Sequence, residues 1–217
     1  DLFLAHGAPL NLAIIPNLLS DATVRQLLMR ELWIPESLGL IQHGWRHTNH
    51  EPAGRKCEFG ISRSPADKFH DIARGKIRLE EAFGPRFYPA FTPPWNRCTP
   101  DTFGLLDELG FMVFSKDRGK EPVEGHRFQE ISTTLDLYRW KGGATLESPD
   151  VIVNTLINQL WDLGTIGILL HHKVMDGTAF TFLDQLLNEL RQFPAVRFHT
   201  FKTLMHEIET THSATRS

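Results

Sequence analysis

Apolar runs rich in β-forming residues alternate along the chain with stretches that carry apolar residues at helical spacing. The expected strands are 10–16, 38–42, 87–91, 111–115, 130–135, 165–170 and 196–201. The expected helices are 20–32, 66–83, 99–109, 149–163 and 178–193, with a last helix that ends near residue 210. Strands that alternate with helices of this length indicate βαβ units and a mostly parallel sheet. We therefore predict an α/β fold.

The chain of 217 residues has the length of one large domain. It contains no repeat, low-complexity tract or linker that would divide it, so we predict a single domain over residues 1–217. Residues 1–7 have the pattern of a helix already under way, and Gly7 is a typical helix stop. We therefore expect a further segment of chain upstream of Asp1.

Three histidines, His43, His47 and His50, directly follow the expected strand 38–42. On a helical turn their spacing would place all three on one face. Neutral imidazole is a good ligand for zinc and its neighbours, and catalytic zinc sites combine a few protein ligands with one open position. The segment predicts a metal site, with His50 supporting the ligands; the alternative is three surface histidines on a polar loop.

Three further polar segments follow the expected strands in the same way. They are Thr92–Asn96 (TPPWN), Asp136–Trp140 (DLYRW) and the pair His171-His172. In a barrel of parallel strands, active sites are built at the face where the strands end. We therefore expect these segments and His43 to contribute to one site.

These segments together resemble the polysaccharide deacetylase (NodB-homology) superfamily, and most closely a bacterial branch of it. The resemblance covers nearly the whole chain and is carried by QHGWRHTNHEPAGRKCEFG at 42–60, PPWNR at 93–97, the DxxxW segment at 136–140 and LLHH at 169–172. It implies a distorted (β/α) barrel of about seven mostly parallel strands. It also implies metal-dependent removal of an acetyl group from an N- or O-acetylated sugar or polysaccharide.

The resemblance also implies site residues at matching positions. His43 and His47 correspond to the family's metal ligands, with zinc as the first expectation and cobalt, nickel or iron as alternatives. His171 corresponds to its general acid, and imidazole, which titrates near neutral pH, suits that role. Asp136 is a candidate to orient His171, as carboxylates often do; the alternative is a strand-end Asx turn.

The sequence departs from the family pattern at three places. The family's Asp-Asp motif lies on a first strand, which would precede Asp1; either an upstream segment supplies it or the protein is not a hydrolase. Thr92 stands where the family has an arginine before the prolines. Arg139 stands where it has the second aspartate of a DxxDW motif.

Aromatic and polar residues near these motifs are candidates to bind the sugar. Trp pairs a flat apolar face with a hydrogen-bond donor, which suits a sugar-binding wall. We expect substrate contacts from Pro94, Trp95, Asn96 and Trp140, with Trp45 as a further candidate, although tryptophan is also common in cores. His172 is expected to support His171 without reacting itself.

Two other functions stay open. Residues 171–177 (HHKVMDG) match HHxxxDG, the signature of CoA-dependent acyltransferases, in which His172 would be the base and Asp176 structural. Asp176 is equally suited to begin the helix at Thr178. The third possibility is a non-catalytic glycan- or metal-binding member of the deacetylase fold.

Composition narrows the partners. The formal net charge of −3 and the absence of a Lys/Arg cluster with interleaved aromatics argue against nucleic acid. No apolar run reaches the ~18 residues of a membrane span. Cys57 and Cys98 form no CxxC pattern, which is typical of reduced thiols, and with no visible signal peptide we expect a cytoplasmic protein. The sequence predicts neither the exact sugar nor the oligomeric state.

Overall fold

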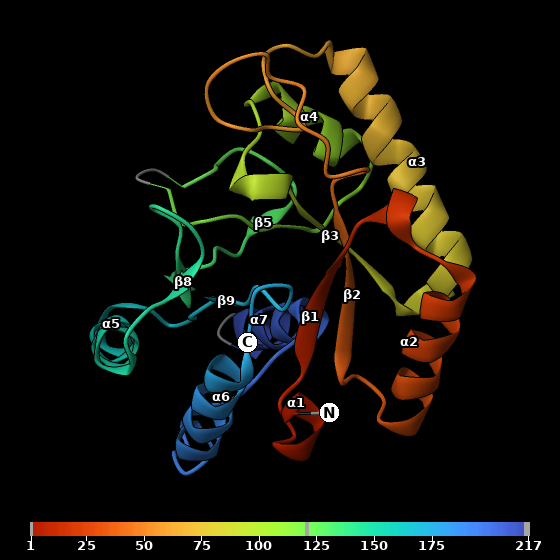
Figure 1. Ribbon diagram of the computed structural model, residues 1–217. Helices are drawn as coiled ribbons and strands as arrows, with labels where there is room; N and C mark the ends of the chain where they lie inside the picture. Colours follow the sequence, from red (N-terminus) through yellow and green to blue (C-terminus); the bar gives the residue numbers. More distant parts are fainter. Residues whose placement is uncertain (1, 120–121, 215–217) are drawn as a thin grey trace.

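A parallel sheet forms the centre of the computed structural model, which describes residues 2–119 and 122–214 (Figure 1). Its strands lie side by side in chain order: β1 (Leu10–Ile14), β2 (Leu38–His43), β3 (Phe87–Thr92), β4 (Val113–Phe114) and β5 (Gln129–Glu130). All four neighbouring pairs are parallel. The carboxyl ends of the strands therefore meet at one edge, as the alternation of strands and helices predicts.

Four shorter strands form two separate pairs. β6 (Leu135–Asp136) pairs in parallel with β9 (Ile168–Leu169), and β7 (Tyr138–Arg139) pairs antiparallel with β8 (Thr145–Leu146). Seven strands are thus in parallel pairings, but in the described residues they form a five-stranded sheet and a separate pair. The expected seven-stranded barrel is not confirmed.

The division between the five-stranded sheet and the β6–β9 pair falls inside the expected strand 130–135. The backbone N–H groups of Ile131 and Thr133 donate to carbonyls at and just after the end of β4. Those of Thr134 and Leu135 donate to the Gly167 carbonyl instead. The segment therefore changes partner midway. Gly167 allows this close approach, because a Cβ there would lie 2.5 Å from the Ser132 carbonyl oxygen.

Seven α-helices connect and cover the strands in the described residues. They are α1 (Leu2–Ala5), α2 (Asp21–Trp33), α3 (Pro65–Phe83), α4 (Asp101–Glu108), α5 (Pro149–Asp162), α6 (Gly177–Leu190) and α7 (Phe201–Ala214). Short 3₁₀ turns lie at Pro16–Leu18, Gly84–Arg86 and Pro94–Asn96. The side chains of Ser20, Ser64, Ser148 and Asp176 accept hydrogen bonds from first-turn backbone N–H groups, which fixes where α2, α3, α5 and α6 begin.

The expected strand at 196–201 is wrong. Residues 194–200 have no regular structure, and α7 begins at Phe201. The Thr200 hydroxyl accepts a hydrogen bond from the Thr203 N–H at 3.2 Å, and the Asn11 side chain accepts one from the Phe201 N–H at 3.0 Å. Val196 and Phe198 still pack against the core, which explains the strand-like pattern of apolar residues.

Apolar packing holds the sheet from both sides. Helices α2 and α3 lie on one face of it and α7 on the other (Figure 1). The main core includes Phe59, Leu79, Phe91 and Phe114, all of them fully buried. A second core, between β6 and helices α5 and α6, includes Leu137, Ile152 and Leu183. Among the described residues, no helix is long and apolar enough to cross a membrane.

Candidate active site

The two predicted metal ligands come together at the end of β2. His43 is the last residue of the strand and His47 lies in the loop beyond it, with their ring centroids 5.1 Å apart. The expected helical turn is wrong, because residues 44–50 are not helical and both Gly44 and His47 have φ near 57°. Gly44 is required for the tight turn, since a Cβ there would lie 2.2 Å from Glu58 Oε2 and 2.6 Å from Pro94 Cγ.

A buried carboxylate, which the sequence reasoning missed, holds this loop. The Glu58 side chain accepts hydrogen bonds from the backbone N–H groups of Trp45 at 3.2 Å and Arg46 at 2.7 Å, and the residue is 0% exposed. Burial raises the pKa of Glu58. The neighbouring strand residue Gln42 donates to the carbonyls of Gly44 and Ile72 at 3.1 and 3.0 Å. The loop that carries His47 is thus fixed by polar groups inside the protein.

The orientation of His43 suits a metal ligand. Its Nδ1 lies 3.0 Å from the Thr92 carbonyl oxygen, so Nδ1 carries the proton and Nε2 keeps its lone pair. Burial lowers the pKa of His43 to about 4, which keeps it neutral at pH 7. Burial also lowers the pKa of His47, with smaller contributions from the charges of Lys173 and Lys56. The pair fits two ligands of a divalent metal; in the described part of the chain no third His, Cys, Asp or Glu completes a three-ligand group.

A second cluster lies at the ends of β6 and β9. His171 Nε2 is 3.0 and 3.1 Å from the two carboxylate oxygens of Asp136. The Trp140 indole N–H donates to Asp136 at 3.0 Å, and the backbone N–H of Tyr138 donates at 2.8 Å. Asp136 therefore has both of the roles that the sequence allowed, since it accepts the hydrogen bond of a local Asx turn and also contacts the His171 imidazole.

The PPWN loop connects the histidine pair to a further carboxylate, Asp117. Trp95 and Asn96 both have φ near 57°, a left-handed conformation that costs non-glycine residues about 1–3 kcal/mol each and concentrates at functional sites. This geometry brings the Trp95 ring to 4.3 Å from the His47 ring, between centroids. It also lets the Asn96 amide donate to Asp117 Oδ1 at 2.5 Å. Pro94 is buried and closes the turn beside Gly44.

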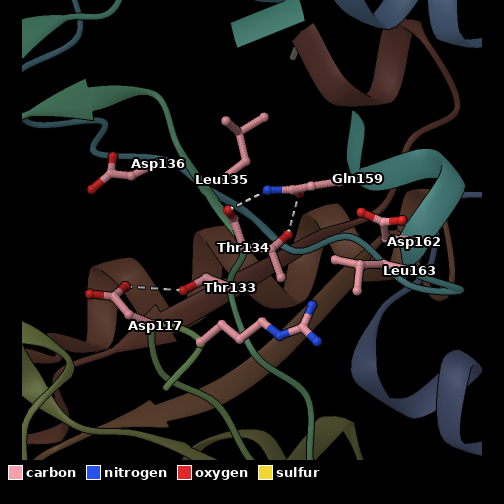
Figure 2. A pocket seen from close by; sticks show the side chains of 9 residues that line it. Asp117, Thr133, Thr134, Leu135, Asp136, Gln159, Asp162 and Leu163 are labelled. Carbon is pink, nitrogen blue, oxygen red and sulfur yellow. Dashed lines mark hydrogen bonds between the residues drawn. The ribbon is translucent and has the colours of Figure 1, made fainter. Parts of the chain in front are cut away.

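Asp117, which follows β4, is a further carboxylate that the sequence reasoning missed. It accepts hydrogen bonds from Asn96 and, at 3.2 Å, from Thr133. Burial raises the pKa of Asp117, and the nearby charge of Asp136 raises it further. Asp117 and Asp136 both line a cavity of about 320 Å³, whose other side is formed by Gln159 and Asp162 at the end of α5 (Figure 2). The signal was available, since Asp117 follows the expected strand 111–115 just as Asp136 follows its own.

Comparison with solved structures identifies the fold. No protein-family model and no curated protein matches the chain. A protein from Mycobacterium smegmatis assigned as a polysaccharide deacetylase superposes with a TM-score of 0.67 at 15% identity, over 97% of this chain and 75% of its own. A family 4 carbohydrate esterase from Streptomyces lividans, in complex with acetate, gives 0.54 at 14% identity, over 88% and 79%. IcaB from Ammonifex degensii gives 0.50 at 17% identity, over 71% and 63%.

The chain has the polysaccharide deacetylase (NodB-homology) fold. Within this fold, the aspartate of the HHxxxDG match begins a helix and the second histidine lies at the surface. The Asp176 side chain accepts a hydrogen bond from the Ala179 N–H at 3.0 Å and so caps α6. His172 is exposed, and its side chain makes no hydrogen bond or ion pair within residues 2–119 and 122–214.

Three further predicted site residues, Trp45, Trp140 and His50, lie in different surroundings. Trp45 is buried, with the Arg74 guanidinium 3.9 Å above its ring, so it belongs to the core and is no wall of a sugar site. Trp140 is 50% exposed and lies edge to face with His171, with ring centroids 4.6 Å apart. The His50 side chain is exposed, and its backbone N–H donates to the Cys57 carbonyl at 3.0 Å.

Proposed function

We propose that the protein is a divalent-metal-dependent hydrolase that removes acetyl groups from an N- or O-acetylated sugar or polysaccharide. The observation that carries this proposal is the presence of two distinct imidazole sites at the ends of parallel strands. One is an oriented, neutral histidine pair, and the other is a histidine bound to a carboxylate. The fold and the carbohydrate esterase from Streptomyces lividans support the same reaction class.

His43 and His47 would hold the metal, with zinc as the first choice and cobalt, nickel or iron as alternatives. A metal of this kind supplies Lewis-acid polarisation of the acetyl carbonyl and a more acidic bound water. The Thr92 carbonyl accepts a hydrogen bond from His43 Nδ1–H and so fixes the tautomer in which Nε2 is available to the metal. The two histidines account for two of the three protein ligands that catalytic zinc sites typically have.

His171 would deliver the proton to the leaving amine or alcohol. Because its Nε2 contacts Asp136, Nδ1 is the nitrogen left to exchange a proton with the substrate. Asp136 would stabilise the imidazolium form and orient the ring, while the N–H groups of Trp140 and Tyr138 hold the carboxylate in place. Pro94, Trp95, Asn96 and Trp140 would border the sugar, with Trp95 closest to the histidine pair.

Release of acetate from acetylated sugars tests this function. Metal-reconstituted protein is incubated with N- and O-acetylated mono- and oligosaccharides, and acetate is quantified. We expect turnover that a chelator abolishes and that His171→Ala lowers by about 10²–10⁴-fold. The matched control is His70→Ala, which alters an exposed histidine on α3. Release that neither chelation nor His171→Ala affects would contradict the proposal.

A second function, glycan binding without hydrolysis, is favoured by one observation. The described residues hold two histidine ligands and no group of three. A binding protein of this kind would take up acetylated glycans while releasing no acetate at any metal concentration. The release assay, run beside a binding measurement on the same glycans, separates the two functions.

A further inference from the structure

Four cations lie in the loops that carry the candidate active site, and each follows a different parallel strand. Lys56 lies in the loop after β2, Arg97 after β3, Arg118 after β4 and Lys173 after β9. We call these four residues the cationic rim. Because the carboxyl ends of β2, β3 and β4 meet at one edge of the sheet, three of the rim cations lie there, although the whole chain has a formal net charge of −3. Lys173 follows β9 of the separate β6–β9 pair.

The contacts of neighbouring residues place the rim beside both clusters of the site. The Arg97 guanidinium donates to the Lys56 carbonyl at 3.1 Å, which joins the first two members. Asn96, the neighbour of Arg97, donates to Asp117, the neighbour of Arg118. Arg118 itself lines the cavity that Asp117 and Asp136 share. Lys173 follows the His171-His172 pair, and its charge is felt at His47 together with that of Lys56.

The rim cations form no ion pairs in the described part of the chain, whereas most carboxylates of the site accept hydrogen bonds. Within residues 2–119 and 122–214, no side chain of the rim forms an ion pair. Glu58 is bonded by backbone N–H groups, Asp117 by Asn96 and Thr133, and Asp136 by His171 and Trp140. Asp162, which lines the same cavity, is the one acidic residue of the site without such a partner in the described part of the chain. The carboxylates keep their charge, since their donors apart from His171 are neutral groups, but their hydrogen bonds occupy them, whereas the rim cations have no carboxylate partner among the described residues and remain available to an anionic ligand.

We propose that the cationic rim binds an oxyanion group, a carboxylate or a phosphate, on the sugar that carries the acetyl group. This inference rests on the proposed deacetylase function and narrows its substrate class to acidic glycans. A guanidinium fork matches either oxyanion with two parallel hydrogen bonds, and a lysine adds a mobile point charge. Cations gathered at the entrance of a site also raise the association rate of anionic ligands, and this effect falls as the ionic strength rises.

Two matched ligand pairs test the proposal by calorimetric binding, without the need for turnover. The first is N-acetylglucosamine against its 6-phosphate; the second is acetylated polygalacturonate as the methyl ester against the free acid. We expect the charged member of one pair to bind about tenfold or more tightly than its neutral partner, with a difference that shrinks at high salt. The pair that responds identifies phosphate or carboxylate as the recognised group.

Variants assign the effect to the rim. We expect two rim variants, Lys56→Gln/Lys173→Gln and separately Arg118→Gln, to reduce the preference for the charged ligand. The control is Arg86→Gln, which alters an exposed cation at the opposite end of β3 and should leave the preference unchanged. Equal affinity for charged and neutral members, or a preference that neither rim variant reduces, would overturn the inference. Acetate release from the same ligands reports separately on the proposed function. Acetate release without a preference for charged ligands would refute only the role of the rim. A preference for charged ligands without acetate release would refute only the hydrolase function.

Discussion

His171 and Asp136 form a direct contact at the carboxyl ends of the paired parallel strands β9 and β6, with Nε2 3.0 Å from Oδ1 and 3.1 Å from Oδ2. The two residues are 35 positions apart in the chain. The pairing of Asp136 with Leu169 in the β6–β9 ladder brings them together. The indole N–H of Trp140 donates to the same carboxylate, so the Asp136 side chain that contacts the imidazole is itself fixed by a hydrogen bond.

Asp136→Asn tests this contact. The amide keeps the shape but loses the charge that stabilises a protonated His171, so we expect kcat for acetate release to fall by about 10–100-fold. The pH–rate profile should shift as well, which a merely structural defect would not produce. Asp162→Asn, in the same cavity but without a contact to His171, is the control. An unchanged profile for Asp136→Asn would show that the carboxylate does not act through His171.

Glu58→Gln should loosen the loop that carries His47. The amide retains one acceptor oxygen but replaces the other with a donor, which leaves a backbone N–H of Trp45 or Arg46 without its acceptor. We expect the free energy of unfolding to fall by about 1–3 kcal/mol, measured by chemical denaturation. Metal affinity should fall with it. Glu124→Gln, at an exposed residue, should change neither quantity.

Gly44→Ala should be more damaging than Gly54→Ala, although both glycines have positive φ. A Cβ at Gly44 meets Glu58 and Pro94 at less than 3 Å, whereas one at Gly54 meets nothing within 4 Å. Gly54→Ala should cost only the left-handed backbone strain of about 1–2 kcal/mol. Gly44→Ala adds the displacement of its neighbours, so we expect roughly 2–5 kcal/mol in the same denaturation experiment. Equal losses would mean that the turn at Gly44 is less tightly packed than the structure has it.

The buried imidazole of His43 should make the stability of metal-free protein depend on pH. Its pKa is about 4 in the folded protein against an ordinary 6.5, so the unfolded chain takes up the proton first as the pH falls. The contribution to the free energy of unfolding is complete above pH 6.5 and is lost between pH 6.5 and 4. The loss should reach roughly 3 kcal/mol. In a plot of the free energy of unfolding against pH, measured by chemical denaturation, His43→Gln should flatten the part between pH 6.5 and 4, whereas His70→Gln should not. Parallel plots for wild type and His43→Gln would contradict this explanation.

Much of the fold could be predicted from the sequence because local signals agree with it. Ser20, Ser64 and Ser148 cap helices where the apolar pattern predicts them to start, and His43, Thr92, Asp136 and His171 lie at or just after strand ends as expected. The errors arise where tertiary contacts decide. Gly167 draws residues 134–135 away from β4, and Asn11 and Thr200 start a helix at Phe201 within an alternating apolar pattern.

The candidate site was predictable to a similar degree. The spacing of His43 and His47 indicates a common role, but a helical turn was the wrong reason: the rings meet because Glu58 and Gly44 shape a tight loop. Glu58 gives no sequence signal of burial, since a glutamate between Cys57 and Phe59 is unremarkable until its N–H partners are known. Asp117 was detectable by its place after a strand, yet its contact with Asn96 depends on the left-handed turn at Trp95.

The metal content of the purified protein tests the central claim most directly. Elemental analysis is performed on the wild type, on His43→Ala/His47→Ala and on His70→Ala after loading with zinc and exhaustive dialysis. The account predicts about one metal ion per chain in the wild type and in His70→Ala, and its loss in the double variant. A wild type that retains no metal, or a double variant that retains as much as the wild type, would contradict it.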